Sequence, residues 1–234
     1  MTPAGAVVLV SGGLDSATVL AIAQAEGYRC HALSFRYGQR HDAEIEAARR
    51  VVATAGVEDH VVVDIDLRAI GGSALTDDAL AVPTHDRVED LDPSLIPVTY
   101  VPARNTIFLS FALGWAEVLG ADHLFLGVNA LDYSGYPDCR PEFLSAFESL
   151  ANVATKAAVA DGRRIRVHAP LLELDKAAIV ARALALGVEL SNTRTCYSLD
   201  ADGVSCGRCD ACLLRRRGFE LAGEVDPIPY RRAP

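Results

Sequence analysis

The sequence predicts an α/β fold built on an open, doubly wound parallel sheet with helices on both faces. Short apolar runs alternate along the chain with segments of helical periodicity. Glycines stop several of the helical segments, and a glycine-rich loop at residues 11–16 joins the first strand to the first helix. This alternation is typical of parallel sheets whose strands are connected by crossover helices.

The first half of the chain contains three predicted strands and two predicted helices. Ala6–Val10 is apolar at every position, as expected of a strand buried on both faces. Ser16–Glu26 places Val19, Leu20 and Ala23 on one helical face. The same alternation continues with a strand at residues 30–35, a helix at 41–55 and a strand at 61–65.

The pattern stops at residues 71–102 and then resumes. This stretch combines four prolines, a Gly71-Gly72 pair and several acids with little periodicity, so we interpret it as an irregular, partly mobile insertion of the kind that often forms a lid. The pattern continues with a helix at 105–119, a strand at 123–128, a helix at 141–159, a strand at 166–169 and a helix at 175–186. We predict one α/β domain over residues 1–190, with a C-terminal segment, 191–234, packed on it.

Charge and hydropathy exclude several classes of protein. The chain has 22 basic and 31 acidic residues, a formal net charge of −9, which disfavours direct binding of nucleic acid. The sequence contains no uninterrupted apolar stretch of about 18 residues, so it predicts no membrane span. Residues 1–5 lack the basic character of a signal peptide. We therefore expect a cytoplasmic protein whose cysteines are reduced.

The loop between the first strand and the first helix has the features of a phosphate site. Its glycines allow tight bending and close approach of the backbone to an anion, and the helix N-terminus presents free N–H groups. Because it follows a strand of a parallel sheet, it should lie at the carboxyl edge, where ligands of such folds bind. The loop lacks the Lys-Ser/Thr ending of a Walker A motif and the three glycines of a dinucleotide motif.

Four cysteines near the C-terminus form a C-x9-C-x2-C-x2-C array: Cys196, Cys206, Cys209 and Cys212. Four thiolates with short spacers suit a closed, structural Zn²⁺ site, which we expect to tie the C-terminal segment to the domain. An iron–sulfur cluster is the main alternative, because it also takes clustered cysteines. We interpret the neighbouring arginines as a solvated basic edge: Arg208, Arg215, Arg216 and Arg217.

The string Ser11–Ser16, SGGLDS, resembles the signature of the PP-loop, or N-type, ATP pyrophosphatases. The resemblance implies an adenine-nucleotide alpha-hydrolase-like fold and cleavage of ATP between its α and β phosphates, with a substrate oxygen activated as an adenylate. Mg²⁺ would compensate the phosphate charge. The nucleotide would be held by Val10, Ser11, Gly12, Gly13, Leu14, Asp15, Ser16, Arg104 and Asn105.

Four further stretches resemble the 7-cyano-7-deazaguanine synthase family of queuosine biosynthesis. They are Tyr37–His41 (YGQRH), Val101–Asn105 (VPARN), Ser134–Arg140 (SGYPDCR) and the cysteine array, which begins at Thr195. They follow the family's order over nearly the whole chain, and the Tyr136–Arg140 string (YPDCR) is the most diagnostic. The family usually has Gly where this chain has Ala103.

The resemblance implies a homodimeric ligase that uses ATP, ammonia and 7-carboxy-7-deazaguanine. The carboxylate becomes an adenylate, ammonia gives the amide, and a second activation yields the nitrile. We expect five residues to be catalytic: Ser11, Asp15, Ser16, Arg104 and Lys176. Arg104 would bind phosphate or carboxylate, and Lys176 would neutralise charge at the α-phosphate. The substrate would be bound by Tyr37, Gln39, Arg40, Asp132, Tyr136, Asp138 and Arg140.

Other functions remain open at this stage. A tRNA-modifying PP-loop enzyme would require an RNA surface, against which the acidic balance counts. A related enzyme could stop at the amide or form another deazapurine adduct, and a nucleotide-sensing module would not turn over ATP. An assay of the products distinguishes these possibilities.

Overall fold

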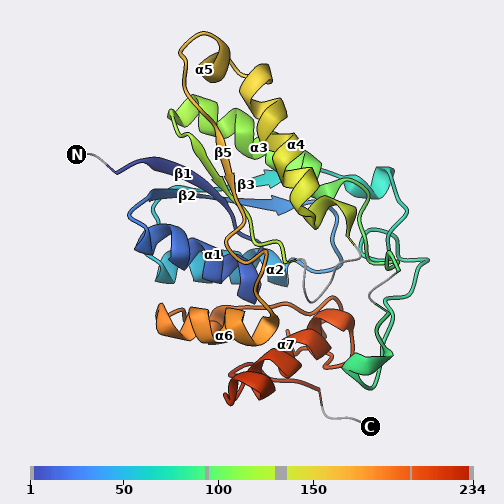
Figure 1. The fold of residues 1–234 in the computed structure, drawn as a ribbon. Coiled ribbons are helices and arrows are strands. Elements are labelled where there is room, and N and C mark those ends of the chain that lie inside the picture. Colours follow the sequence, from blue (N-terminus) through green and yellow to red (C-terminus); the bar gives the residue numbers. More distant parts are fainter. Residues whose placement is uncertain (1–2, 93–94, 130–135, 201, 232–234) are drawn as a thin grey trace.

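The parallel sheet predicted from the sequence is present. The computed structural model describes residues 3–92, 95–129, 136–200 and 202–231. Within them, five parallel strands lie in the order β3-β2-β1-β4-β5 (Figure 1). They are β1 (Gly5–Leu9), β2 (Arg29–Arg36), β3 (His60–Asp64), β4 (His123–Phe125) and β5 (Arg166–His168). The strand order reverses between β1 and β4, which places the ligand crevice of this topology at their carboxyl ends.

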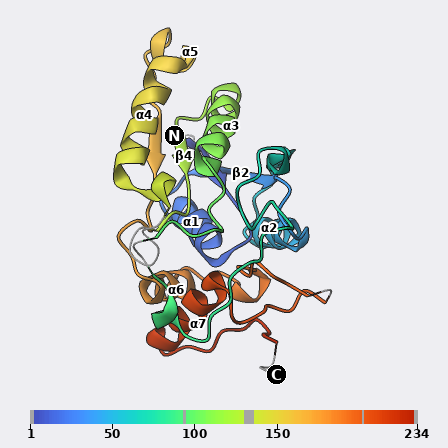
Figure 2. The same ribbon diagram turned by 90° about the vertical axis from the view of Figure 1, so that its right-hand side faces the viewer.

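Helices cover both faces of the sheet, and a third layer lies beneath one of them. One face carries α1 (Leu14–Ala25) and α2 (Ala43–Thr54); the other carries α3 (Arg104–Leu119) and α4 (Pro141–Ala154), which is followed by the short α5 (Lys156–Val159) (Figures 1 and 2). On the α1 side, α6 (Lys176–Ala185) packs on α1, and α7 (Asp210–Ala222) packs on α6. The sequence did not predict this outer layer.

Strand β1 lies between two apolar cores, as its composition predicts. Val8 faces the α1 side and packs in one cluster with Leu20, Ile179 of α6 and Phe219 of α7. Val7 faces the α3 side and belongs to the other cluster. Both valines are fully buried. Because Phe219 belongs to the first core, the C-terminal segment shares the hydrophobic interior of the domain.

The structure corrects the sequence prediction at two places. The helix expected over 141–159 breaks at Thr155, whose backbone is extended and whose Oγ1 accepts a hydrogen bond of 3.3 Å from the Ala158 N–H, so it caps α5. The cysteine-rich segment contains α7, which was missed. Its buried face includes Cys212, Arg215 and Gly218, so apolar periodicity did not reveal it.

Arg215 contradicts the prediction of a solvated basic edge. Its side chain is 1% exposed, and its guanidinium donates to both carboxylate oxygens of Asp226 at 2.8 and 2.9 Å. It also donates to Thr193 Oγ1 at 2.7 Å and Thr195 Oγ1 at 3.1 Å. Burial is tolerated because the charge is paired and its donors are satisfied. The prediction holds for the three other arginines, which are exposed: Arg208, Arg216 and Arg217.

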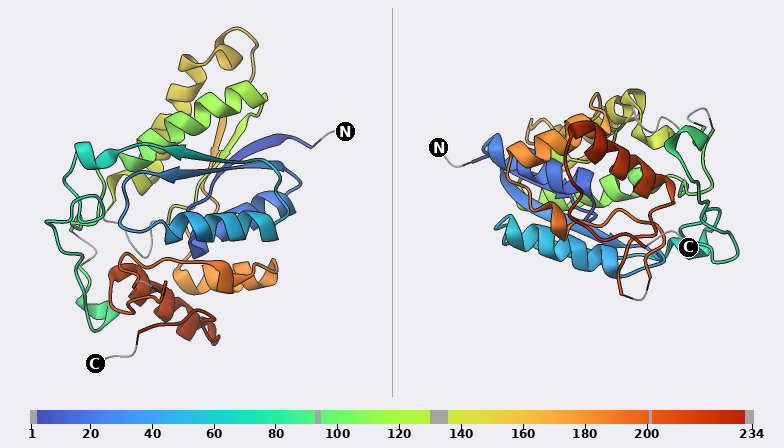
Figure 3. Two further views of the ribbon diagram at one scale, coloured as in Figure 1. Left: turned by 180° about the vertical axis from the view of Figure 1, so that it is seen from behind. Right: turned by 90° about the horizontal axis from the view of Figure 1, so that it is seen from below.

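The insertion at 71–102 runs from the carboxyl edge of the sheet down to the C-terminal segment (Figure 3). It includes the short 3-10 helix η2 (Val88–Asp90), which contacts α7. The backbone N–H of His85 donates to the Arg208 carbonyl at 2.8 Å, and Arg208 forms an ion pair with Asp86 at 2.7 Å. The insertion is therefore attached to the cysteine array as well as to the sheet. The described part of the chain contains no helix long and apolar enough to span a membrane.

Candidate active site

One cavity of about 270 Å³ opens at the carboxyl ends of β1, β2 and β4. Its walls come from the phosphate loop, the first turns of α2 and α3, and the C-terminal segment on both sides of the cysteine array. These parts are distant in sequence and meet because the strand order reverses at β1 and β4. Among the residues that the sequence singled out, the cavity is lined by Val10, Ser11, Gly13, Leu14, Asp15, Ser16, Tyr37, Gln39, Arg104, Asn105, Tyr136 and Lys176.

Hydrogen bonds of its two serines fix the shape of the phosphate loop. The Ser16 hydroxyl accepts from the Ser11 N–H at 3.1 Å and lies 3.1 Å from the Ser11 hydroxyl. The Gly13 N–H donates to Ser11 Oγ at 3.4 Å. Helix α1 begins at Leu14 with Gly13 as its N-cap residue, so the first N–H groups of the helix face the loop. This is the arrangement that binds phosphate at a helix N-terminus.

Gly12 brings helix α2 against the loop. Its φ is +83°, and a Cβ at this position would lie 2.5 Å from the backbone nitrogen of Ala48 and 2.6 Å from the carbonyl oxygen of Glu44. The Gly12 carbonyl in turn accepts the Arg194 N–H at 2.8 Å. Glycine is therefore required here by the backbone conformation and by the space. Through it the loop contacts both α2 and the C-terminal segment.

Lys176 reaches the phosphate loop from the outer helical layer. Its Nζ donates to both carboxylate oxygens of Asp15, at 3.0 and 2.8 Å, and its side chain is 14% exposed. Asp175 caps α6 through the Ala178 N–H at 2.8 Å, as predicted, and so fixes the start of the helix. A Cβ on Gly218 of α7 would lie 2.5 Å from Lys176 Cγ, so glycine leaves the space that the lysine stem occupies.

Arg104 begins α3 and is surrounded by aromatic side chains. The carbon at the centre of its guanidinium lies 6.0 Å from the ring centroid of Tyr37, within cation–π range. Burial raises the pKa of Tyr37 to about 12 and also raises that of Tyr197. The Tyr136 hydroxyl is within 3.0 Å of Thr99 Oγ1. The cavity thus combines a cation with neutral aromatic groups, which suits a flat, anionic ligand.

Ala103, which precedes Arg104, has a left-handed backbone conformation with φ +53° and ψ +25°. It is the only residue other than glycine with positive φ in the described ranges. The left-handed conformation strains an L-residue by roughly 1–2 kcal/mol, and glycine would relieve this strain. Glycine also loses more conformational entropy on folding than alanine, which costs about 0.5–1 kcal/mol. We expect Ala103→Gly to raise the free energy of unfolding by about 0.5–1 kcal/mol, measured by equilibrium urea unfolding.

The control for this substitution is Ala53→Gly, at an exposed position inside helix α2. There the same change should lower the free energy of unfolding by about 1 kcal/mol, because glycine has a lower helix propensity than alanine and there is no backbone strain for it to relieve. Destabilisation by both variants would contradict the assignment of strain to Ala103.

Asn105 and Asp138 fix the first turn of α3. The Asp138 carboxylate accepts the Asn105 backbone N–H at 2.9 Å, and the Asn105 amide donates to the Asp138 carbonyl at 3.0 Å and to Cys139 Sγ at 3.4 Å. Burial raises the pKa of Cys139 to about 12, so this thiol stays protonated. Asp138 thus lies behind the cavity wall, where it positions α3.

The other predicted substrate contacts have different surroundings. The Arg40 guanidinium donates to three backbone carbonyls of the insertion, at Ala74, Asp77 and Leu80, and so anchors the insertion. The Gln39 amide bonds the Tyr37 N–H and the Phe35 carbonyl and shapes its own turn. Arg140 is exposed at the start of α4. Asp132 lies outside the described residues. Their contacts with a substrate stay predictions.

Several lining residues were not anticipated from the sequence. Glu44 enters from the first turn of α2, and Arg194, Thr195, Tyr197 and Asp210 enter from the two ends of the cysteine array. Thr195 and Tyr197 lie in a stretch that carried the family resemblance, which was a usable signal. Glu44 lies on a helix three residues after the Tyr37–His41 stretch, and only the approach of α2 to Gly12 brings it to the cavity.

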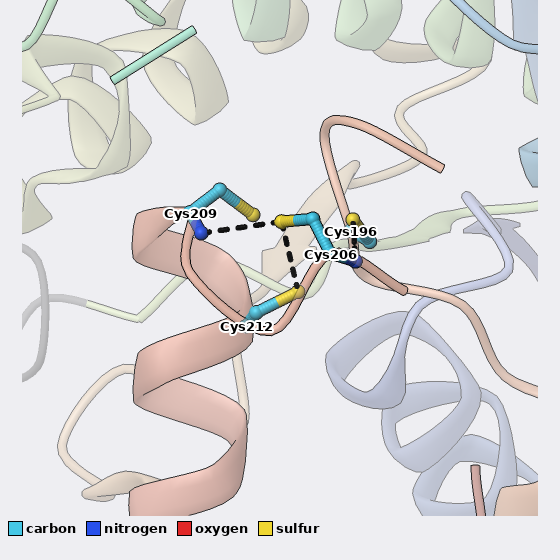
Figure 4. A group of neighbouring side chains, drawn as sticks. All are labelled: Cys196, Cys206, Cys209 and Cys212. Atoms are coloured by element: carbon cyan, nitrogen blue, oxygen red, sulfur yellow. Dashed lines mark hydrogen bonds between the residues drawn. The ribbon is translucent and has the colours of Figure 1, made fainter. Parts of the chain in front are cut away.

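The four cysteines converge as their spacing predicts. Their sulfur atoms all lie within 4.8 Å of one another, and they point toward a common centre from two loops and the start of α7 (Figure 4). The distance of 3.9 Å between the sulfurs of Cys206 and Cys212 is close to the roughly 3.8 Å edge of a tetrahedral zinc–thiolate site. Backbone N–H groups of Ser198 and Cys206 each donate to Cys196 Sγ at 3.2 Å. Such donors stabilise thiolates, so the set fits a metal ion.

Comparison with known proteins shows the family of this chain. A family model described as "Queuosine biosynthesis protein QueC" matches residues 5–223. The chain belongs to the QueC family. Its match spans the phosphate loop, the walls of the cavity and the cysteine array, so the whole site lies within the family region.

Full-length relatives of this QueC-family chain share most of its sequence. The 7-cyano-7-deazaguanine synthase of Methylococcus capsulatus is 62% identical over 226 residues, which cover 97% of this chain and 98% of the relative. The protein of the same name from Cupriavidus necator is 60% identical over 228 residues, which cover 97% and 98%. That of Geobacter sulfurreducens is 60% identical and covers 96% and 92%.

Among solved structures, the NMN synthetase of Francisella tularensis matches 96% of this chain and 79% of its own, with 15% identity and a TM-score of 0.49. This is a likeness of the overall chain path, and the family assignment does not depend on it.

Proposed function

We propose that this QueC-family protein converts 7-carboxy-7-deazaguanine and ammonia to 7-cyano-7-deazaguanine with ATP. The observation that carries the proposal is the single cavity into which a phosphate-binding loop, a lysine, an arginine and a set of tyrosines all open. The relatives that bear this enzyme name match the chain from end to end at about 60% identity. A PP-loop enzyme that modifies tRNA is disfavoured by the acidic balance of the chain.

The geometry supports activation of the substrate carboxylate by ATP. The loop and the N-terminus of α1 would hold the pyrophosphate portion, and Arg104 would orient the carboxylate from the other side. The carboxylate oxygen attacks the α-phosphorus, the bond to pyrophosphate breaks, and an adenylate forms. Lys176, held by Asp15, adds positive charge beside the loop where negative charge develops.

The nitrile requires two activations, because two oxygens leave the same carbon. Ammonia forms the C–N bond as AMP departs, which gives the amide. The amide oxygen then attacks a second ATP, and loss of AMP with the remaining N–H protons gives the C≡N bond. Buried, neutral tyrosines such as Tyr197 would cover the flat base and exclude water that could hydrolyse the adenylate.

We propose two metal ions for the working enzyme. Zn²⁺ would be bound by the four cysteines, where a closed thiolate site contributes stability and no reaction chemistry. Mg²⁺ would accompany ATP at the phosphate loop, with Ser11 and Ser16 nearby, and would neutralise phosphate charge. A homodimer and a cytoplasmic location complete the proposal, which rests for these two features on family resemblance.

The test is an assay of purified, zinc-replete protein with ATP, Mg²⁺, ammonium and 7-carboxy-7-deazaguanine, with purines and nucleotides followed by mass spectrometry. We expect the nitrile, with two AMP formed per nitrile, since each oxygen lost needs its own activation. Amide as the only purine product would refute the nitrile assignment. ADP and phosphate in place of AMP and pyrophosphate would refute the adenylate route.

A further inference from the structure

Glu44 is a half-buried acidic residue in the first turn of helix α2. Its neighbours one turn on, Ala47 and Ala48, are fully buried, whereas Glu46 faces solvent and pairs with Arg49 at 2.5 Å. Gly12 allows the backbone of this turn to lie directly against the phosphate loop. As a result, the Glu44 side chain lines the cavity instead of the protein surface.

The surroundings of the Glu44 carboxylate leave it free to accept a proton. Two titratable groups face it: Tyr37, from the end of β2, and Arg104, from the start of α3. Within the described residues, neither hydrogen-bonds to this carboxylate, and Arg104 attracts it only through space. Burial raises the pKa of Glu44 to about 7, against the opposing effect of Arg104. A carboxylate of this kind can take up and release protons near neutral pH.

The proposed reaction needs such a group, because nitrogen must lose protons at each stage. When ammonia forms its bond to the adenylate carbon, the nitrogen carries an excess proton that must leave. Conversion of the amide to the nitrile removes its last two N–H protons. Neither Lys176, which is engaged with Asp15, nor Arg104, which stays protonated, can accept them.

We propose that Glu44 is the general base that removes protons from the substrate nitrogen, with Arg104 holding the reacting carboxyl group opposite it. This inference rests on the proposed function. In amide formation the C–N bond forms, the proton passes to the Glu44 carboxylate, and the C–O bond to AMP breaks with its electron pair. In nitrile formation Glu44 takes one N–H proton as the amide oxygen attacks the α-phosphorus of the second ATP and pyrophosphate leaves. After that proton is released to solvent, Glu44 takes the second, whose electron pair completes the C≡N bond as AMP leaves.

The test compares Glu44→Gln with Glu46→Gln, a matched change of an exposed glutamate on the same helix. Two reactions are measured in the full-length, zinc-replete protein. The first is exchange of labelled pyrophosphate into ATP, dependent on 7-carboxy-7-deazaguanine and run without ammonia, which reports adenylation alone. The second is formation of amide and nitrile across pH 5.5–9. Circular dichroism and thermal unfolding check that both variants are folded.

We expect Glu44→Gln to keep the exchange rate within about threefold and to lower product formation by about 10²–10⁴-fold. In the wild-type protein, kcat/KM for ammonia, corrected for the fraction of free NH3, should rise with pH through about 7 as Glu44 loses its proton. That rise should vanish in Glu44→Gln and persist in Glu46→Gln. Hydroxylamine, a nucleophile largely unprotonated at neutral pH, should partly restore the first acyl transfer in Glu44→Gln.

Three results with Glu44→Gln would overturn the assignment. Unchanged product formation in Glu44→Gln would remove any role in the reaction. Loss of exchange together with product in a folded variant would assign Glu44 to nucleotide or carboxylate binding. A raised Mg²⁺ requirement for exchange would assign it to the cation. Absence of product from the wild-type protein would refute the proposed function itself, and the base role with it, before any variant is compared.

Discussion

Gly12→Ala is expected to abolish ATP-dependent activity and to lower the free energy of unfolding by about 2–5 kcal/mol, the sum of left-handed strain and overpacking. The added Cβ would lie 2.5 Å from the Ala48 nitrogen and 2.6 Å from the Glu44 carbonyl oxygen. Both atoms belong to helix backbone, so no side-chain rotation relieves the contact. Either the loop or the first turn of α2 must move, and either movement deforms the phosphate site.

The matched control is Gly27→Ala. Gly27 has nearly the same positive φ, +86° against +83°, but a Cβ there meets no atom within 4 Å. In this variant the free energy of unfolding should fall only by the cost of left-handed strain, roughly 1–2 kcal/mol, and activity should be unchanged. Urea unfolding and ATP turnover measure both variants. Equal effects at the two positions would show that conformation, and not the contact with α2, determines the role of Gly12.

Loss of the proposed zinc ion should be the most damaging change outside the phosphate loop. We expect Cys209→Ser, or treatment with a strong chelator, to lower the unfolding free energy by at least about 3 kcal/mol and to abolish activity, because a structural metal contributes on the order of 10 kcal/mol to ordering its segment. Arg194, Thr195, Tyr197 and Asp210 lie beside the cysteines and line the cavity, so this wall should be lost with the ion.

Hydrogen exchange locates the effect. Amides of residues 194–231 and of 85–90, which is bonded to Arg208, should lose protection, whereas β1 and β2 should keep it. Cys30→Ser is the control, since Cys30 is buried in the first core and remote from the array in sequence. Metal analysis should give one zinc per chain for the wild-type protein and for Cys30→Ser. Full ATP turnover by metal-free protein would contradict the prediction.

The parts of the site that the sequence predicted are those encoded by local pattern. Apolar runs, glycine stops and the position of SGGLDS between strand and helix gave the sheet and the phosphate loop. The spacing of the cysteines gave their convergence. Each depends on residues close together in the chain, so periodicity and spacing are enough to reveal it.

The parts that the sequence did not predict depend on pairs far apart in the chain. Lys176 by itself resembles a helix-surface residue, and only the family resemblance assigned it to the phosphates. Its contact with Asp15, 161 residues away, requires α6 and the space left by Gly218. Arg215 in a run of three arginines resembles a solvated edge until Asp226 is placed beside it. Burial of charge is decided by a tertiary partner, and local composition carries no record of it.

The hydrogen bond between Arg194 and Gly12 has a consequence for the order of events during synthesis. The loop is synthesised long before three of its neighbours: the Arg194 backbone group that donates to it, the lysine that contacts it and the cavity wall formed by the C-terminal segment all come from the last quarter of the chain. A nascent chain with a complete β1–β4 sheet therefore holds only half a nucleotide site. Catalytic competence therefore requires synthesis of the C-terminal segment through Asp226, which pairs with the buried Arg215 of the cavity wall.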